Sequence, residues 1–468
     1  MREYKLIKLL EHFSNTELKQ FESFCSSQNG EKHKLTLLLK SIQDSLKRKE
    51  SEQEYIVAFL LKKHQIDIKI LRKLFHELLE VAKDFIVIQQ IKNESFIHNY
   101  YFLLYVEEKE LYNEFKKDFE DAQLALNKLP KIDTKDLWFD YSFNVFQNNI
   151  DVNHNIIEGN RKIQNQIDAL DRYILFAKLV DLCNALSHSK VFSNTLVITW
   201  ADTFIQLAEN DIRFQKDKLI QPFLAAVKLL LTNEEVYFEK MLNAIVDEEN
   251  CLHDQLLRLM ITVAENFAAW KINNGFNYTK EVHLLHVTRI KSNTLVNKNN
   301  LISPGVFLNA VTAALQLNKT DFVRQFIKEQ SPKLEQSVRK DIAAFCQCKI
   351  LLVEKKYGET IQLLNKTTFT DLFYQVGGRR MILQCFYELN EMSALDSALH
   401  ALKVFVNRKK EVAPSSAESN NNFLNILSAI TKLNKGDKEK AQKLLEQTQQ
   451  TKAIADRKWL IEKIQKFL

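Results

Sequence analysis

Four short segments between Ala313 and Leu445 decide the expected fold: Leu317-Asn318-Lys319-Thr320-Asp321, Leu352-Val353-Glu354-Lys355-Lys356, Leu389-Asn390-Glu391-Met392-Ser393 and Leu433-Asn434-Lys435-Gly436-Asp437. Each begins with a leucine that closes a helical pattern, passes through a polar turn and leads into a second helical pattern. The four leucines stand 35, 37 and 44 residues apart. A period of about 34 to 40 residues is typical of stacked helix pairs. The sequence therefore predicts an all-α protein, an α-solenoid of stacked antiparallel helix pairs.

The composition supports this prediction. Only 8 glycines and 5 prolines occur in 468 residues, against an average usage of roughly 7% and 5%. So few glycines and prolines allow few tight hairpin turns, which argues against a β fold. Hydrophobic residues make up 46% of the chain, enough for an extended core. No linker rich in proline, glycine or serine interrupts it.

We expect three regions along the chain. Residues 1–92 form an N-terminal helical bundle, residues 93–300 form irregular helical repeats, and residues 301–468 form the clearer repeats with a C-terminal capping helix. Ser14-Asn15-Thr16-Glu17 is a capping box, which predicts a helix start. Ser303-Pro304 predicts another, with serine as the N-cap and proline in the first helical position.

Within these regions, two short helical patterns and two breaks are also expected. A charged loop is predicted over residues 47–52, followed by a short helix over residues 55–61. A helix is predicted over residues 196–207, and a loop over residues 407–422 accounts for the long last repeat step. In the terminal helix, Ile454, Leu460, Ile464 and Phe467 should form the apolar side, with Lys452, Lys458, Lys463 and Lys466 largely outside it.

Aromatic residues are concentrated between Phe96 and Phe146, where 13 of 51 residues are Phe, Tyr or Trp. The simplest interpretation is aromatic packing between neighbouring helices. The alternative is a partner-binding groove, for which Tyr101 and Tyr105 are the candidate contacts, because phenol hydroxyls tolerate an exposed surface. Stacking of single-stranded bases fits less well, because the neighbouring charges are mostly acidic.

Signatures of catalysis and of cofactor binding are missing. The chain has no Gly-x-Gly-x-x-Gly motif, no Gly-x-x-x-x-Gly-Lys phosphate loop and no Gly-x-Ser-x-Gly elbow. His283 and His286 would share a helix face, but two histidines are an incomplete metal site. Cys346 and Cys348 point about 200° apart on a helix, which indicates packed side chains and not a chelating pair. We therefore expect a non-catalytic protein without metal or cofactor.

Candidate partner contacts are Lys349, Arg379 and Arg380 in the clearer repeats. Gly377-Gly378-Arg379-Arg380 allows two interpretations. Two glycines before two arginines at a helix start could bind an anion. Alternatively, the glycines allow two helices to approach closely.

The net charge of +6 lies at the two ends of the chain: residues 1–92 carry +4, residues 93–399 carry −5 and residues 400–468 carry +7. A charge run is usually a solvated helix face. The sharper hypothesis is a nucleic-acid contact by the basic termini, including a helix-turn-helix reader with Lys69, Arg72 and Lys73 on its recognition helix. A capping bundle for the solenoid explains the same residues.

The expected location is the cytoplasm. The first residues lack the apolar core of a secretory signal, and no apolar run approaches 18 residues, so no membrane insertion is expected. The six cysteines are too sparse for a disulfide framework and suit a reducing compartment.

The repeats resemble tetratricopeptide-like proteins. Tyr357-Gly358-Glu359-Thr360-Ile361 occupies the place of that family's aromatic-acidic-alanine turn, and Gly436-Asp437-Lys438-Glu439-Lys440-Ala441 is closer still. The family's early Trp and closing Pro are missing. The chain also resembles a group of long helical proteins from Bacteroidetes, through residues 18–24, residues 70–74 with Leu78, Leu79 and Phe85, and residues 385–389 with 405–409. The first resemblance implies a helical-repeat scaffold for a protein or peptide partner. The second does not suggest any particular activity.

Overall fold

The computed structural model describes residues 2–29, 34–47, 57, 61–62, 67–153, 159–192, 197–408, 414–434 and 436–468. All regular secondary structure in these residues is helical, and the β-type pairing among them is one isolated bridge between Ile132 and Leu252. The all-α prediction is confirmed. The predicted helix over residues 55–61 and the loop over residues 47–52 lie almost entirely outside the described residues.

The chain divides into two compact units. The first comprises Met1–Leu129 and Phe139–Ile167, and the second comprises Pro130–Trp138 and Asp168–Leu468. The division passes through two helices, α8 (Thr134–Asn153) and α9 (Gly159–Phe192). The three regions expected from the sequence remain a prediction.

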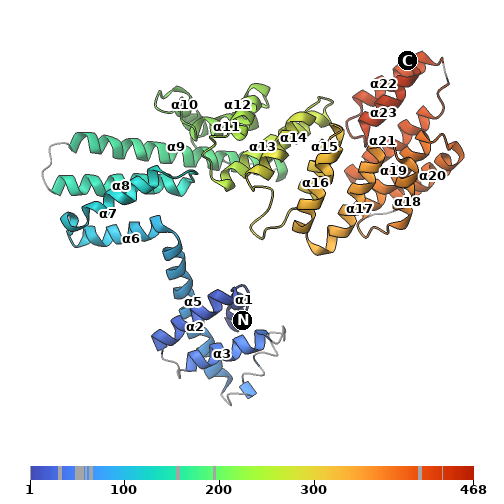
Figure 1. Ribbon diagram of the computed structural model, residues 1–468. Helices are drawn as coiled ribbons and strands as arrows, with labels where there is room; N and C mark the ends of the chain where they lie inside the picture. Colours follow the sequence, from blue (N-terminus) through green and yellow to red (C-terminus); the bar gives the residue numbers. More distant parts are fainter. Residues whose placement is uncertain are drawn as a thin grey trace. The chain divides into compact units, whose positions relative to one another are not determined.

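The first unit begins with a small bundle. In it α1 (Arg2–Glu11), α2 (Asn15–Asn29) and α3 (Lys34–Lys47) pack around α5 (Ile68–Asn93), as Figure 1 shows. Its core contains Phe21 and Phe85, whose ring centroids lie 5.2 Å apart. Burial of this apolar surface is the main force that holds the helices together.

The predicted capping box begins α2. The Ser14 amide donates to Glu17 Oε2 over 2.7 Å, and the Glu17 amide donates to Ser14 Oγ over 3.2 Å. Hydrogen bonding by the Ser14 side chain and by the Ser14 amide lowers the pKa of the Glu17 carboxyl. Both orphan amides at the helix start are thus satisfied by side chains that lie three residues apart, so a local pattern is enough to specify the start.

Aromatic side chains fill the contacts among α6 (Ser95–Glu108), α7 (Tyr112–Asn127) and α8. Phe119 on α7 packs edge-on against Phe143 and Phe146 on α8, with centroids 6.2 and 6.3 Å apart. Tyr100 on α6 also packs on Phe146, at 5.6 Å. Most of the aromatic run is therefore used in packing between neighbouring helices.

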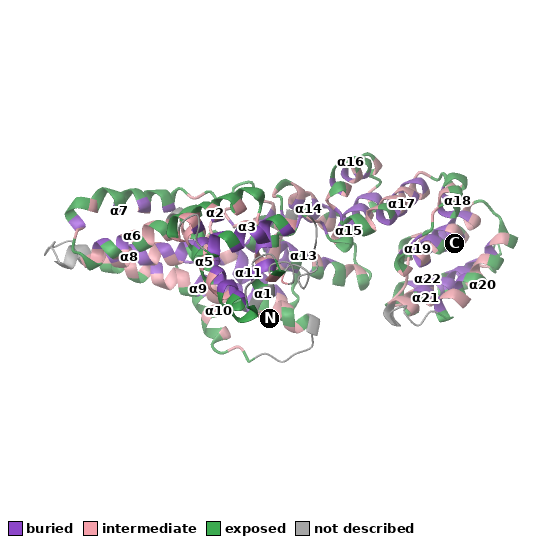
Figure 2. Cartoon of the chain, turned by 90° about the horizontal axis from the view of Figure 1, so that it is seen from below, coloured by how far each residue is buried: buried purple, intermediate pink, exposed green. Residues whose placement is uncertain are grey.

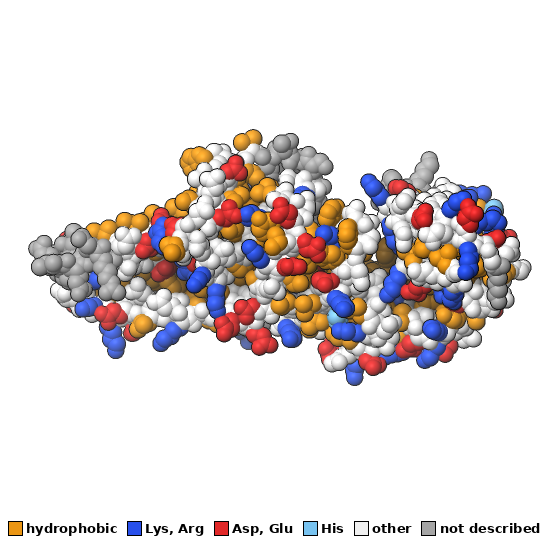
Figure 3. All heavy atoms as spheres, turned by 90° about the horizontal axis from the view of Figure 1, so that it is seen from above, with side chains coloured by type: hydrophobic (Ala, Val, Ile, Leu, Met, Phe, Trp, Pro, Cys, Tyr) orange, Lys and Arg blue, Asp and Glu red, His pale blue; other side chains and the backbone are white. Residues whose placement is uncertain are grey.

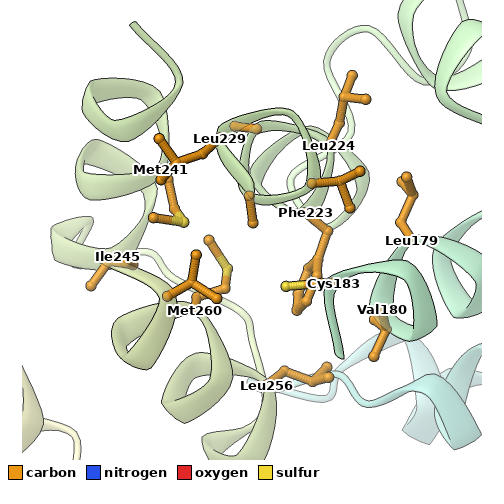
Figure 4. Close-up of a cluster of buried hydrophobic side chains, with 14 of the residues drawn as sticks. Leu179, Val180, Cys183, Phe223, Leu224, Leu229, Met241, Ile245, Leu256 and Met260 are labelled. Carbon is orange, nitrogen blue, oxygen red and sulfur yellow. The ribbon is translucent and has the colours of Figure 1, made fainter. Parts of the chain in front are cut away.

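The second unit starts with a large apolar core. It is built by α9 together with α10 (Ala201–Asn210), α11 (Ile220–Thr232), α12 (Glu235–Val246) and α13 (Asp254–Asn273). Figure 4 shows Cys183 and Phe223 pointing into this cluster, with Met241 and Met260 beside them. The predicted helix over residues 196–207 begins later than expected, because Trp200 takes a left-handed conformation with φ 62° just before α10.

The remaining helices of the second unit pack mainly on their neighbours in sequence. In Figure 2 their buried residues face one another and their exposed residues face outward. In chain order they are α14 (Thr279–Lys291), α15 (Pro304–Gln316), α16 (Thr320–Gln330), the 3-10 turn η1 (Ser331–Lys333), α17 (Gln336–Val353), α18 (Tyr357–Lys366), α19 (Leu372–Glu388), α20 (Met392–Arg408), α21 (Pro414–Ile430), α22 (Lys438–Gln450), α23 (Arg457–Ile464) and the 3-10 turn η2 (Gln465–Phe467).

One turn geometry recurs at the ends of α15, α17 and α19. In each case a left-handed residue follows the last helical turn, at Asn318 (φ 56°), Lys355 (φ 61°) and Asn390 (φ 62°). The left-handed residue donates its amide to the carbonyl three residues back, and the next residue donates to the carbonyl five residues back. This pair of hydrogen bonds is the Schellman motif. The amides and their acceptors are Asn318 to Leu315, Lys319 to Ala314, Lys355 to Leu352, Lys356 to Leu351, Asn390 to Tyr387, and Glu391 to Phe386.

The recurring turn corrects the register of the predicted repeat. Leu317 and Leu389 are the C-cap residues of their helices, but the equivalent residue of α17 is Glu354 and not Leu352. The structural steps from C-cap to C-cap are therefore 37 and 35 residues. The sequence pattern selected a leucine near the end of each helix, whereas the C-cap is the residue directly before the left-handed position.

Two other predictions in the C-terminal part are wrong. The predicted loop over residues 407–422 is largely helical, because α21 begins at Pro414 and buries Asn420 together with Phe423. Lys463, expected outside the apolar side of the terminal helix, is only 8% exposed and pairs with Glu388 on α19. A buried ammonium requires such a partner.

Candidate functional site

Lys349 lies half-buried on α17 and is held by two contacts. Its Nζ donates to Thr312 Oγ1 on α15 over 2.9 Å and lies 5.6 Å from the centroid of the Phe345 ring. Burial lowers the pKa of the Lys349 ammonium, and the Asp456 carboxylate opposes that shift. This ammonium is therefore held in place by Thr312 on α15 and by Phe345 on α17.

Arg379 and Arg380 are adjacent in α19 but make contacts with different elements. Arg380 Nε donates to Asp456 Oδ2 over 2.9 Å, and its Nη1 donates to Asn420 Oδ1 over 2.7 Å. The exposed Arg379 instead stacks on Phe405 of α20, with its guanidinium carbon 4.3 Å from the ring centroid. Only Arg380 shares electrostatic surroundings with Lys349.

Asn420 orients the Arg380 guanidinium by accepting a hydrogen bond from it. The asparagine is 2% exposed, and its Nδ2 donates to the Ser416 carbonyl over 2.6 Å, which leaves Oδ1 aimed at Arg380. The guanidinium of Arg380 on α19 is thus held in position by a side chain of α21. Planar guanidinium groups held in this way recognise carboxylates with defined geometry.

The segment before α23 completes the site. Asp456 pairs with Arg380, and Lys458 Nζ donates to the Gln316 carbonyl at the end of α15 over 3.3 Å. Arg380 on α19 and the Gln316 carbonyl of α15 therefore contact Asp456 and Lys458 at the start of α23. Asn420 on α21 contacts Arg380, and the Asp456 carboxylate acts through space on Lys349 of α17. We call this set the Arg380 network, and its members are Thr312, Gln316, Lys349, Arg380, Asn420, Asp456 and Lys458.

The glycines next to the arginines serve packing and not anion binding at a helix start. Gly377 and Gly378 are buried in α19, which begins at Leu372, so their amides lie inside the helix. A Cβ atom on Gly378 would come 3.2 Å from Leu364 Cδ2 on α18. The close-approach interpretation is therefore confirmed, and the anion-binding interpretation is wrong.

Tyr101 and Tyr105 lie on an outward side of α6 and are each 56% exposed. The Tyr101 ring packs edge-on against Tyr100 at 5.4 Å, and Lys109 Nζ lies 5.7 Å from the Tyr105 ring centroid. The other aromatic residues of this region are mainly packed between helices. The two tyrosines belong to the first unit, so they are a candidate surface separate from the Arg380 network.

A second buried polar cluster lies between α13 and α14. Arg289 makes a two-pronged contact with Glu265, with Nε to Oε1 and Nη2 to Oε2 both at 2.8 Å. His286 is 1% exposed, and its Nδ1 lies 3.4 Å from Glu265 Oε1. Burial is the main cause that lowers the pKa of His286 to about 4. The histidine is therefore neutral at pH 7 and forms part of the packed interior.

In the described part of the chain, no group of three or more His, Cys, Asp or Glu side chains is arranged to hold a metal ion. His283, the other histidine considered for a metal, packs edge-on against Phe322 at 5.0 Å. Cys346 and Cys348 are both buried, which confirms their expected role as packed side chains. None of the helices in the described residues is long and apolar enough to cross a membrane.

Sequence reasoning found Lys349 and Arg380 but missed the residues that organise them. Asn420 stands in a run of three asparagines that looked like a loop, and Asp456 lies 76 residues from Arg380 along the chain. No local pattern connects residues so far apart. Only the packing of α21 and α23 on the preceding helices brings them together.

No family model matches this chain, and no curated protein or solved structure matches it. The two resemblances given above therefore rest on the residues quoted for them.

Proposed function

We propose that the protein is a non-catalytic helical-repeat scaffold of the tetratricopeptide-like kind, with α15 to α22 as its α-solenoid, and that it binds a protein or peptide partner in the cytoplasm. The observation that carries this proposal is the Arg380 network. Polar side chains from alternate helices, α15, α17, α19 and α21, meet in one place. In a stack of helix pairs, alternate helices line the same face, and that face is the usual binding surface.

The chemistry of the network favours a peptide or protein surface over a small substrate. Lys349 and Arg380 supply positive charge, and Asn420 supplies a fixed polar contact. Extended peptides bind such surfaces through several spaced contacts, none of which needs to be strong by itself.

A site-specific crosslink tests this proposal. A photoreactive p-benzoylphenylalanine replaces Gln316, which is exposed beside the network, and a control protein carries it at the exposed Asp396 on α20. Both are irradiated in cytosolic extract with and without nuclease. We expect a protein crosslinked from residue 316 and not from residue 396, and we expect it to survive nuclease treatment.

The partner is then purified and its binding measured directly. We expect Lys349→Met combined with Arg380→Gln to weaken binding at least tenfold, and the neighbouring Arg379→Gln to leave it unchanged. Equal losses with both variants would place the binding surface elsewhere on α19. Loss of all crosslinked material on nuclease treatment would favour the nucleic-acid alternative.

That alternative keeps one supporting observation in the first unit. Lys69, Arg72 and Lys73 are all exposed at the beginning of α5. At the C-terminal end, by contrast, Lys463 is buried in a pair with Glu388. On the face drawn in Figure 3, basic and acidic side chains are interspersed, whereas binding to a phosphate backbone is favoured by a continuous basic area. Binding that weakens steeply with salt would support this alternative.

A further inference from the structure

Residues 451–458, which we call the latch segment, bring Asp456 and Lys458 to the other members of the Arg380 network. Three contacts tie its middle part to α21 and α19. The Ala455 amide donates to the Ser419 carbonyl over 3.2 Å, Asn422 Nδ2 donates to the Ala453 carbonyl over 2.7 Å, and Asp456 pairs with Arg380. At its end, Lys458 reaches α15. The segment therefore contacts three of the four helices that form the network.

Asp456 occupies the position that a partner's carboxylate would take. Arg380 donates to it while Asn420 holds the other side of the guanidinium. The Asp456 carboxylate also acts on Lys349 through space, opposing the burial that lowers the pKa of this ammonium. One acidic side chain of the chain itself thus pairs with Arg380 and partly offsets the charge of Lys349.

The backbone at Asp456 is in an uncommon conformation. Its φ of 49° and ψ of 35° are left-handed, and its side chain forms no N-cap hydrogen bond to α23. An aspartate directly before a helix usually caps it with this carboxylate. Here the carboxylate is turned to Arg380 instead, and the left-handed conformation carries a steric cost for any residue other than glycine. The contact with Arg380 is therefore formed at the expense of the local arrangement.

Opening the latch segment would release only Arg457 and Lys458 from the first turn of α23. Leu460 and Ile464 of α23 are fully buried in the core, and Trp459 Nε1 donates to Glu388 over 2.9 Å. By contrast, the Asp456 and Arg380 side chains are 34% and 22% exposed. Ion pairs that retain contact with water stabilise a structure only weakly. Opening thus breaks these polar contacts, removes Ile454 and Ala455 from the edge of the apolar core, and relieves the conformation of Asp456.

We propose that residues 451–458 are an intramolecular latch, and that a partner segment bearing a carboxylate opens it by replacing Asp456 at Arg380 and Asn420. The partner class is an acidic peptide, because the site presents two cations and one neutral polar group to the residue that fills it. The proposal that an acidic partner binds here rests on the proposed function, whereas the proposal that residues 451–458 open does not. The two parts are therefore tested separately.

Hydrogen exchange of the full-length protein tests the latch without any partner. The reporter is the Ala455 amide, which exchanges only when its hydrogen bond to Ser419 opens. We expect exchange in peptides covering residues 453–458 to be at least tenfold faster in Arg380→Gln and in Asp456→Asn. The matched control is Arg379→Gln, which we expect to exchange like the wild type. Unchanged protection in both test variants would overturn the latch.

Two features keep this experiment decisive if Arg380→Gln loses stability. Asp456→Asn alters a partly exposed side chain and leaves the polar contact of Asn420 in place. Amides of α11 in the buried core of the same unit report global unfolding, and we expect their exchange to be unchanged. Faster exchange in both α11 and the latch segment would indicate general loosening and would count against a local latch.

Cysteine labelling measures access to the site itself. Thr312→Cys places a thiol in the half-buried part of the network, and the half-buried native Cys251 serves as an internal reference. We expect a charged maleimide to label Cys at position 312 at least fivefold faster when Asp456→Asn is added, with the Cys251 rate unchanged. Equal labelling rates with and without Asp456→Asn would overturn the proposal that the latch controls access.

Fluorescein-labelled hexaglutamate tests the partner class by anisotropy at low salt, with hexalysine as the control peptide. We expect Asp456→Asn to bind hexaglutamate at least fivefold more tightly than the wild type, and Asp456→Asn/Arg380→Gln to lose this gain. Measurable and equal binding by wild type and Asp456→Asn would show that Asp456 does not compete for the site, which would overturn its replacement by a partner and leave the proposed binding face standing. Faster exchange and labelling without binding of hexaglutamate would support the latch and overturn the acidic partner.

Discussion

Gly377 on α19 lies directly against the Phe345 ring on α17: a Cβ atom built on the glycine would stand 2.7 Å from Phe345 Cζ. The ring cannot easily move aside, because it is 3% exposed and packs against Phe369 and Tyr374 with centroids 6.0 and 5.2 Å away. The separation of these two helices is therefore set by the missing side chain. This spacing also places Lys349 and Arg380, which lie on the same two helices.

We expect Gly377→Ala to destabilise the protein by about 1–3 kcal/mol, the usual cost of inserting atoms into a packed core. The matched control is Gly358→Ala near the start of α18, where an added Cβ meets nothing within 4 Å. Because alanine is the better helix former, we expect the control to have no effect or to stabilise by up to about 1 kcal/mol. Urea unfolding followed by circular dichroism measures both, and similar stabilities of the two variants would contradict the packing argument.

Features set by near neighbours in the chain were predictable from the sequence. The Ser14 and Glu17 capping box and the Ser303 N-cap, whose Oγ accepts from the Val306 amide over 3.4 Å, both appear where expected. The polar turns after Leu317 and Leu389 also lie at helix ends, because a left-handed C-terminal residue favours asparagine.

Features set by distant contacts were not predictable. A buried lysine such as Lys463 is identified only by its partner Glu388, and a buried asparagine such as Asn420 only by the arginine that it faces. From polarity alone, Lys463 was predicted outside the packed side of its helix and Asn420 was predicted in a loop. The candidate site was therefore found in part: its cations follow from the sequence, but the carboxylate that pairs with Arg380 does not.

The turn after α17 has a lysine where the backbone favours glycine. Lys355 is exposed and holds φ at 61°, a conformation that costs a residue with a Cβ about 1 kcal/mol. We expect Lys355→Gly to stabilise the protein by roughly 0.5–1 kcal/mol in thermal or urea unfolding. Lys355→Ala removes the same charge but keeps the Cβ, so we expect no such gain from it. Equal gains from both variants would assign the effect to charge and not to backbone conformation.

The buried pair of Arg289 and Glu265 is expected to show strong coupling. Arg289→Met leaves the Glu265 carboxylate without its two-pronged partner, and we expect a loss of about 3–5 kcal/mol. In Glu265→Leu/Arg289→Met both charges are gone, and we expect the double variant to be more stable than Arg289→Met alone. A double-mutant cycle in urea measures this coupling. Additive losses would show that the two side chains act independently.

His286 makes stability depend on pH. Burial is the main cause that lowers its pKa from 6.5 to about 4 in the folded protein, with Arg289 and His283 adding to the shift and Glu265 opposing it. Because the unfolded chain binds the proton first, this contribution is complete above about pH 6.5 and is lost as the pH falls toward 4. We expect a loss of roughly 2–3 kcal/mol between pH 7 and pH 4.5 from this residue. His286→Leu fills a similar volume without a titrating group. Between pH 7 and pH 4.5 we therefore expect the free energy of unfolding of this variant to fall by roughly 2–3 kcal/mol less than that of the wild type. Parallel pH profiles for the wild type and His286→Leu would show that the buried imidazole does not take up the proton on unfolding.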